Sequence, residues 1–291
     1  MLQGSSEDVL ASDAMRKYRG RIQLIFTSPP FPLNRKKKYG NLQGESYVEW
    51  LASFAPIFRD FLKKDGSIVI ELGNAWEPGK PVMSNLALKS LLAFQEEGDF
   101  NISQQFVAYN KARLPSPAQW VNIERIRVKD SYTNMWWMAP SERPKADNTK
   151  VLKEYSPAML HLLESGKYSS GKRPSEHNIG KKSFLKNNKG AIPSNVLVVS
   201  NTLASDDYMA YCKKRKMPLH PARMPREIPD FFIRFLTDPG DIVLDPFAGS
   251  NITGWSSERL GRRWISIEKD RVYALTSRSR FCDSIVRVKG R

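Results

Sequence analysis

Short apolar runs of strand length alternate with longer stretches of helical periodicity along much of this chain of 291 residues. Ile22–Phe26 is a β-branched and aromatic run that predicts a buried strand, and Ser46–Lys63 carries apolar residues at the three- and four-residue spacing of an amphipathic helix. Such alternation predicts an α/β fold with a mainly parallel, twisted sheet and helices on both of its faces. Further strands are expected at Ser67–Leu72, Phe100–Tyr109, Asn134–Met138, Val196–Ser200 and Trp264–Ile267, and further helices at Met83–Glu97, Leu152–Leu163, Arg226–Leu236 and Thr253–Leu260.

The first strand ends in Thr27-Ser28-Pro29-Pro30-Phe31. Two prolines must stop a strand, because proline donates no ladder hydrogen bond and has a fixed φ angle. The rigid tip presents a hydroxyl, a main-chain carbonyl and an aromatic ring, a set suited to holding a flat heterocycle with an amino group, such as a nucleobase. The alternative is an ordinary proline-stiffened turn. The strand-like run before the tip and the basic cluster Arg35, Lys36, Lys37 and Lys38 after it favour a functional site.

A second candidate site lies far along the chain, where the strand Asp241–Asp245 runs into a bend that contains Gly249. The helix Thr253–Leu260 and a strand that ends in Glu268 follow. A glycine allows a ligand to approach the backbone closely, a helix N-terminus favours the anionic end of a ligand, and an acid after the next strand can accept both ribose hydroxyls. This order predicts a nucleotide-type site, although the full glycine spacing of a dinucleotide site is absent.

The chain carries 46 Lys and Arg against 30 Asp and Glu, a formal net charge of +16. This excess suggests a polyanionic partner, nucleic acid ahead of a membrane, because no long apolar segment is evident. The alternative is a charge that serves solubility alone. From about Pro140 to Leu219 the chain is rich in Lys, Asn, Ser, Gly and Pro, and is expected to form an inserted module. Within it, Ser165–Gly190 could instead be locally disordered without DNA.

The two cysteines, Cys212 and Cys282, lie too far apart for a metal-binding spacing or a disulfide framework. Three histidines give no cluster for a zinc site or an acid–base relay, so no metal is expected. The first residues do not form a secretory leader, which makes a reducing cytoplasm the expected location.

Taken together, Thr27–Phe31 and Asp245–Gly254 resemble the catalytic and cofactor motifs of S-adenosylmethionine-dependent DNA amino-methyltransferases. The order of catalytic motif, recognition insert and cofactor motif is that of their β group, and the resemblance is greatest to the PvuII type of cytosine-N4 modification methylases. Supporting stretches are Leu114–Pro117, Trp120–Asn122, Ile126–Asp130, Trp136-Trp137 and His220–Pro225.

The resemblance implies a role for individual residues. The catalytic group would be Ser28, Pro29, Pro30 and Phe31, with Phe31 stacked on the target base. Ser5 stands where the family usually has an aspartate that contacts adenine, and the strand expected before Gly4 is almost missing. The residues implied to bind S-adenosylmethionine are Ser5, Thr27, His220, Pro221, Ala222, Arg223, Asp245, Phe247, Ala248, Gly249, Ser250, Thr253 and Glu268.

The resemblance also implies a domain organisation and partners. Residues 1–139 would form the catalytic half of the methyltransferase domain, residues 140–219 the basic target-recognition insert, and residues 220–291 the cofactor-binding half. Double-stranded DNA would be the substrate, with phosphates bound by Arg35, Lys36, Lys37 and Lys38 and by Lys181 and Lys182 of the insert. The chain would act as a monomer or homodimer beside a companion restriction endonuclease that it does not contact directly.

Three alternatives to cytosine-N4 transfer need consideration. An adenine-N6 methylase of the same group is the nearest, although Ser28 argues against it because an acidic residue is commoner there in related adenine enzymes. A cytosine-C5 methylase needs a nucleophilic cysteine after proline, a context that neither Cys212 nor Cys282 has. A DNA-binding module without catalysis is the third, and measured binding of S-adenosylmethionine would separate it from an enzyme.

Overall fold

A computed structural model describes residues 1–31, 42–199 and 207–281. It divides into two compact units, one formed by Met1–Ala146 with Asn195–Arg291 and the other by Asp147–Ser194. The second unit falls within the stretch 140–219 that the composition marks as an insert. The basic cluster Arg35–Lys38 and Cys282 lie outside the described residues.

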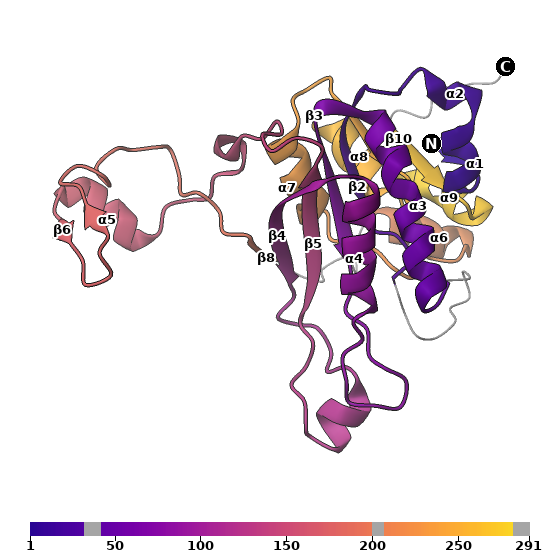
Figure 1. Cartoon of the computed structure of the whole chain (residues 1–291), viewed down its shortest axis with the longest axis horizontal. Helices are drawn as coiled ribbons and strands as arrows, with labels where there is room; N and C mark the ends of the chain where they lie inside the picture. The colour runs from indigo at the N-terminus through magenta and orange to yellow at the C-terminus, as the bar shows by residue number, and fades with distance from the viewer. Residues whose placement is uncertain (32–41, 200–206, 282–291) are drawn as a thin grey trace. The chain divides into compact units, whose positions relative to one another are not determined.

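The first unit contains an eight-stranded sheet (Figure 1), in the order β1-β10-β9-β2-β3-β5-β4-β8. Only β5 runs antiparallel to its neighbours β3 and β4, and every other pairing of this described sheet is parallel. The predicted α/β fold with a mainly parallel sheet is therefore confirmed. The strands are β1 (Leu2–Gln3), β2 (Ile22–Thr27), β3 (Leu62–Leu72), β4 (Asn101–Tyr109), β5 (Tyr132–Ala139), β8 (Val196–Val198), β9 (Ile242–Asp245) and β10 (Arg263–Glu268).

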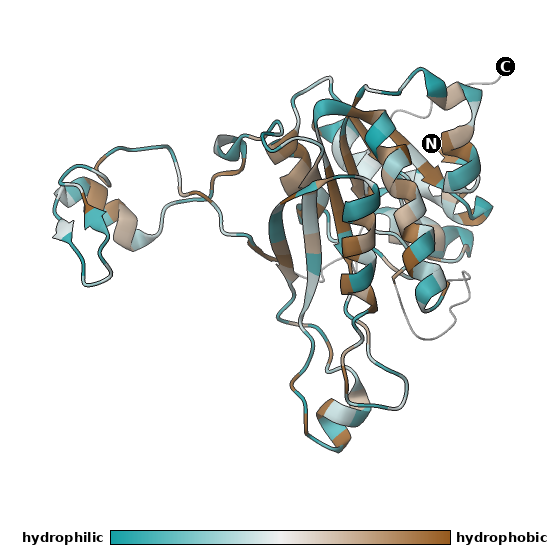
Figure 2. Cartoon of the chain, in the orientation of Figure 1, coloured by the Kyte–Doolittle hydropathy of each residue, from teal (hydrophilic) through white to brown (hydrophobic). Residues whose placement is uncertain are grey.

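Helices cover both faces of this sheet (Figure 1). Alternate side chains of β2 point to opposite faces, so Ile25 packs in a core with Phe54 while Phe26 packs in another with Phe232. The strand is buried on both faces, which explains why four of its six residues are apolar. Figure 2 shows the sheet strands as largely hydrophobic. The helices of this unit are α1 (Ser6–Ala11), α2 (Asp13–Arg16), α3 (Glu45–Phe61), α4 (Leu86–Glu97), α6 (Asp207–Arg215), α7 (Glu227–Leu236), α8 (Ile252–Arg259) and α9 (Arg271–Ser277).

Several element boundaries differ from the sequence-based expectation. Strand β3 begins at Leu62 and not at Ser67, so α3 ends at Phe61. Helix α4 begins at Leu86, three residues later than expected. The strand before Gly4 is as short as expected: β1 has two residues, which pair with the end of β10.

The second unit is small and contains α5 (Pro157–Ser165) and a two-stranded antiparallel sheet of β6 (Gly171–Lys172) and β7 (Asn178–Ile179). Helix α5 starts five residues later than expected because Ser156 caps it by accepting a hydrogen bond from the Met159 N–H, and Pro157 occupies the first turn. Lys181 and Lys182 are exposed just after β7.

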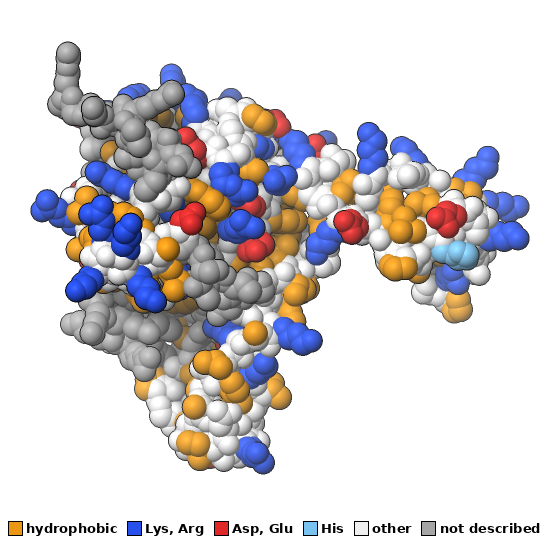
Figure 3. All heavy atoms as spheres, turned by 180° about the vertical axis from the view of Figure 1, so that it is seen from behind, with side chains coloured by type: hydrophobic (Ala, Val, Ile, Leu, Met, Phe, Trp, Pro, Cys, Tyr) orange, Lys and Arg blue, Asp and Glu red, His pale blue; other side chains and the backbone are white. Residues whose placement is uncertain are grey.

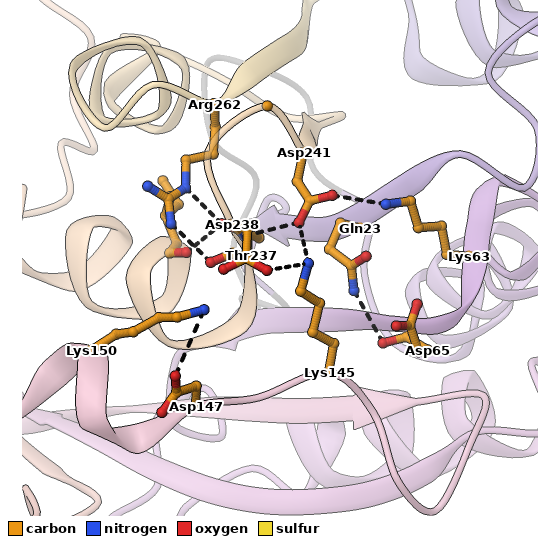
Figure 4. Close-up of polar contacts among 12 residues, drawn as sticks. Gln23, Lys63, Asp65, Lys145, Asp147, Lys150, Thr237, Asp238, Asp241 and Arg262 are labelled. Atoms are coloured by element: carbon orange, nitrogen blue, oxygen red, sulfur yellow. Dashed lines mark hydrogen bonds and ion pairs between the residues drawn. The ribbon is translucent and has the colours of Figure 1, made fainter.

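A network of charged side chains ties the start of β9 to β3 and to the chain that leaves β5 (Figure 4). Asp241 accepts hydrogen bonds from Lys63 and Lys145, both at 2.8 Å, and Lys145 also pairs with Asp238 at 2.6 Å. Burial alone would raise the pKa of Asp241, but the hydrogen bonds from Lys145 and Lys63 hold that pKa below its ordinary value. Among the described residues, no helix is both long and apolar enough to cross a bilayer.

Candidate active site

The two candidate motifs meet where β2 and β9 end side by side. Ile25 pairs with Leu244 in the parallel register of these strands, so Thr27 and Asp245 reach the same edge of the sheet. The Thr27 hydroxyl donates to Asp245 Oδ1 at 2.8 Å, and the Thr253 hydroxyl donates to Oδ2 at 2.6 Å. One carboxylate therefore joins the strand that carries Ser28 to the helix that follows the glycine bend.

Asp245 is buried, and its environment opposes its charge. Burial raises the pKa of Asp245 to about 6, although the hydrogen bonds from Thr253, from Thr27 and from the Phe247 N–H favour the ionised form. The Phe247 N–H donates to Oδ1 at 3.1 Å. Both carboxylate oxygens thus accept hydrogen bonds inside the protein, and Asp245 links the two halves of the site.

Ser28, at the tip of β2, is hydrogen-bonded to a side chain that the sequence reasoning missed. Its hydroxyl contacts the carboxylate of Glu71, which lies on the neighbouring strand β3. Burial raises the pKa of Glu71, while the Ser28 hydrogen bond and the positive charge of Arg113 act in the opposite direction. The available signal in the sequence was a single acid between Ile70 and Leu72, inside a run that is otherwise apolar.

Phe31 lies against the backbone at the end of β3. A Cβ atom added to Gly73 would collide with the Phe31 ring, so this close approach requires glycine. Pro29 is buried, whereas Ser28, Pro30 and Phe31 are partly exposed. Ser28 and Phe31 are therefore partly exposed residues of a tip that contacts the end of β3 through Glu71 and Gly73.

The cofactor bend has the backbone geometry that its glycine predicts. Gly249 adopts a φ of +52°, and a Cβ atom there would lie 2.8 Å from the ring of His220. The Gly249 N–H donates to Glu268 Oε2 at 2.8 Å, and the Asp270 N–H donates to Oε1 at 2.8 Å. Burial raises the pKa of Glu268, against the effect of these two hydrogen bonds. Glu268 and His220 thus face the bend from two sides.

His220 is held in one orientation by the elements around it. Its Nδ1 contacts the carbonyl of Ala222 at 2.5 Å, and its ring meets Tyr273 edge-on with 4.7 Å between ring centroids. Burial lowers the pKa of His220, which favours the neutral ring with its proton on Nδ1. The hydroxyl of Tyr208 accepts a hydrogen bond from the His220 N–H at 3.1 Å. This support was missed because α6, which carries Tyr208, was not predicted.

The remaining residues implied to bind the cofactor lie around the same bend. Phe247 packs on Trp50 of α3 with 5.5 Å between ring centroids, and the Ala248 N–H donates to the Ile267 carbonyl at 2.9 Å. Arg280 donates to the Ser250 carbonyl at 2.7 Å, a second contact that the sequence reasoning missed. Pro221 and Ala222 are exposed, and Arg223 is partly exposed.

The Ser5 hydroxyl, which the resemblance implies contacts the cofactor, forms hydrogen bonds within its own segment of chain. It caps α1, accepting from the Asp8 N–H at 3.1 Å and donating to the Asp8 carboxylate at 2.6 Å. The next residue, Ser6, donates to the Pro246 carbonyl, so the segment does border the cofactor bend. The individual roles of these residues toward a ligand stay predictions.

A hydroxyl-bearing strand tip beside a glycine bend, on one edge of a mainly parallel sheet, is the arrangement of an α/β methyltransferase site. A family model described as DNA methylase matches residues 22–278. The chain is 46% identical over 265 residues to the type II methyltransferase M.PvuII of Proteus hauseri, a match that covers 90% of this chain and 79% of that protein.

Solved structures agree with this assignment. The PvuII DNA methyltransferase (cytosine-N4-specific) matches with a TM-score of 0.76 and 38% identity over 97% of this chain and 86% of that one. The M1.HpyAVI–SAM complex matches with a TM-score of 0.54 and 20% identity over 96% of this chain and 97% of that one, a likeness of fold alone. The chain belongs to the DNA methylase family, and the resemblance seen in its motifs is confirmed.

Proposed function

We propose that this methylase transfers a methyl group from S-adenosylmethionine to the exocyclic N4 of a cytosine flipped out of duplex DNA. The observation that carries the proposal is the contact between Ser28 and Glu71 at the strand tip, next to the bend around Gly249. The name of the structural neighbour, cytosine-N4-specific, supports cytosine as the target.

The bend offers the donor and acceptor groups that this cofactor needs. Because Gly249 has no side chain, the His220 ring packs directly against the bend, and we place the methionine end of the ligand beside this contact. The Glu268 carboxylate stands at the end of β10, where it can accept hydrogen bonds from ribose hydroxyls. Phe247 presents an apolar ring on the same bend.

The chemistry follows from the strand tip. Bound at the bend, S-adenosylmethionine would supply a methyl group on a sulfonium sulfur, a leaving group that keeps the electron pair of the carbon–sulfur bond. Ser28 Oγ and the Pro29 carbonyl would accept hydrogen bonds from the amino group of cytosine. These bonds favour a tetrahedral nitrogen, whose lone pair is no longer delocalised into the ring and points toward the methyl group. The proton that the amino group loses passes to Ser28 Oγ as the Ser28 proton passes to Glu71. Positioning and hydrogen bonding supply the acceleration.

DNA is the substrate class of the family, and we propose that both basic parts of the chain bind it. A base inside a duplex cannot reach the strand tip, so it must be flipped out at a cost of a few kcal/mol. Phosphate contacts from Arg35–Lys38 and from Lys181 and Lys182 would offset that cost, and the insert would read base edges. The protein would act as a modification methylase in the cytoplasm beside a companion nuclease.

The test is to incubate the protein with duplex DNA and S-adenosylmethionine labelled in its methyl group, then identify the labelled nucleoside. N4-methylcytosine is expected. Labelled N6-methyladenine would overturn the cytosine assignment, and absence of label together with absence of cofactor binding would overturn the enzyme. The matched variants are Ser28→Ala, expected to lose most of the transfer rate while keeping cofactor and DNA affinity, and Lys64→Gln, an exposed lysine at the opposite edge of the sheet, expected to keep all three.

A further inference from the structure

The connection between β4 and β5 is a long excursion to which the proposed function assigns no contact with DNA. This segment, residues 110–131, is called the finger below, and it contains most of the stretches that support the family resemblance. It leaves β4 after Tyr109 and returns at Tyr132, the start of β5. Because Leu72 pairs with Asn134 and Ile70 with Thr27, the finger stands at the edge of the sheet where β2 and β3 end (Figure 1).

The base of the finger is bonded to the strand end that supports the tip of β2. Asn74 Nδ2 donates to Asp130 Oδ1 at 3.1 Å, and Asn134 Nδ2 donates to Asn74 Oδ1 at 3.2 Å. Asn74 directly follows Gly73, the residue against which Phe31 lies. The finger is therefore fixed to the residue next to the one that Phe31 contacts.

The finger has internal structure of its own. The Ile126 N–H donates to the Trp120 carbonyl at 3.0 Å, and the Val121 N–H donates to the Pro117 carbonyl at 3.1 Å. Arg127 bonds to the Pro81 carbonyl and lies over the ring of Trp76 at 5.5 Å. These contacts hold the finger against residues 76–81, so its outward side chains are displayed by an ordered element.

Those outward side chains include four large apolar residues. Leu114, Ile123, Ile126 and Val128 are between 57% and 88% exposed. Apolar side chains concentrated on so short an element of a protein surface indicate a contact surface. Figure 3 shows hydrophobic and basic side chains as neighbours on the lower projection of the molecule.

The charge of the finger indicates what it contacts. It has five basic and two acidic residues, a net charge of +3. Its cations bond to main-chain carbonyls: Lys129 to Lys111 at 2.9 Å, and Arg113 to Tyr132 at 2.9 Å. No ion pair forms within the finger, all of which is described, so its positive charge is not neutralised there. A surface of apolar side chains among unneutralised cations is complementary to the groove and phosphates of a nucleic acid duplex.

We propose that the finger is a second DNA-binding element, which places its apolar side chains in the groove beside the flipped base and its cations on the flanking phosphates. This inference rests on the proposed function, because it takes the duplex to be the one whose base enters the strand tip. It adds a contact made by the first compact unit itself, independent of the insert.

The first experiment measures the affinity of the full chain for a duplex that it methylates, as a function of salt, after Lys111→Gln and Arg125→Gln together. Log affinity falls as log salt rises, and each lost phosphate contact makes this slope shallower by about 0.9. The slope of the double variant should therefore be shallower by about 1.8. Affinity for S-adenosylmethionine should not change. Lys64→Gln is the control, and its slope should equal that of the unmodified protein.

The second experiment locates the finger on the DNA. An iron chelate attached at Val128→Cys, in a chain that also carries Cys282→Ser, should cleave the duplex next to the methylated cytosine, whereas the same chelate at Lys64→Cys should not. Cys212 is buried and does not compete for the label.

Unchanged slope and no cleavage near the target, in a protein that still methylates DNA, would overturn the finger inference and leave the proposed function standing. An unchanged slope with a loss of self-association in the finger variants would overturn it in favour of a surface for a second copy of this chain. Failure of the unmodified protein to methylate any duplex would overturn the proposed function and this inference with it.

Discussion

Replacement of Asp245 by asparagine should change how the stability of the protein depends on pH. The pKa of Asp245 is raised from 3.8 to about 6 by burial, so the fold favours the protonated acid relative to the unfolded chain. The sign follows from linkage: this contribution to stability is fully present below pH 3.8 and is lost as pH rises through about 6. At about 1.36 kcal/mol per pKa unit, the loss amounts to about 3 kcal/mol.

Asparagine keeps much of the local geometry. Its oxygen can still accept from the Thr27 hydroxyl and the Phe247 N–H, and its amide can donate to the Thr253 oxygen once that hydroxyl turns. The variant is neutral at every pH and avoids the cost of burying a charge. Relative to the unmodified protein, Asp245→Asn should therefore gain stability as pH rises from 3.8 through about 6, by up to about 3 kcal/mol, and this gain should stay constant at higher pH.

The assay is urea unfolding followed by tryptophan fluorescence at several pH values, with the two proteins compared at each. When the unfolding free energies of the two proteins are subtracted, the contributions of groups that titrate alike in both proteins cancel. Asp241→Asn is a control of opposite sign, because Lys145 and Lys63 hold the pKa of Asp241 low and its contribution is lost as pH falls. The stability gain of Asp245→Asn over the unmodified protein should grow as pH rises from 3.8 through about 6. A gain that stays constant or shrinks over this range would refute the assignment of Asp245 as a buried carboxylate whose charge is costly.

Three further substitutions separate the parts of the site. Glu71→Gln should lower the single-turnover rate by about 10²-fold or more and remove from its pH profile the ionisation that makes the unmodified rate rise with pH; an unchanged profile would exclude proton uptake by Glu71. Gly73→Ala should displace the Phe31 ring and slow transfer while a cofactor titration stays unchanged, and equal losses in both would mean a general packing defect. Arg280→Met should weaken cofactor binding several-fold through the lost support of Ser250, whereas Arg278→Met, at an exposed arginine nearby, should not.

The fold could be predicted from the sequence where burial leaves a pattern. Strand β2 is apolar at each position from Leu24 to Phe26 because both faces of the sheet are covered there. Helix α3 has apolar residues at helical spacing because one of its faces is buried. Helix α6 was not predicted because its sequence is strongly basic, with Tyr208 and Cys212 as its buried side chains. Its packing comes from tertiary contacts, such as the Tyr208 hydroxyl with Thr276, which no local pattern encodes.

The sequence predicts those residues of the site that lie beside prolines or glycines, because these residue types mark a special backbone conformation. Proline pairs and bend glycines can be recognised in a sequence, which is why Ser28 and Gly249 were found. Glu71 and Arg280 act through partners on other elements, and a lone acid or arginine carries no mark of that partner. Only the strand order, which sets β3 beside β2, shows that Glu71 reaches Ser28.

The strand order also explains how motifs separated by more than 200 residues form one site. In a parallel sheet the carboxyl ends of neighbouring strands share an edge, and β9 and β2 are neighbours although β9 comes near the end of the chain. Asp245 then needs only to accept from Thr27 on one strand and Thr253 on the following helix to fix the distance between the two motifs. A charge buried at that junction costs stability, and it lies where the position of β2 relative to the glycine bend is set. The pH dependence of Asp245→Asn therefore measures the stability that the buried charge costs at this junction.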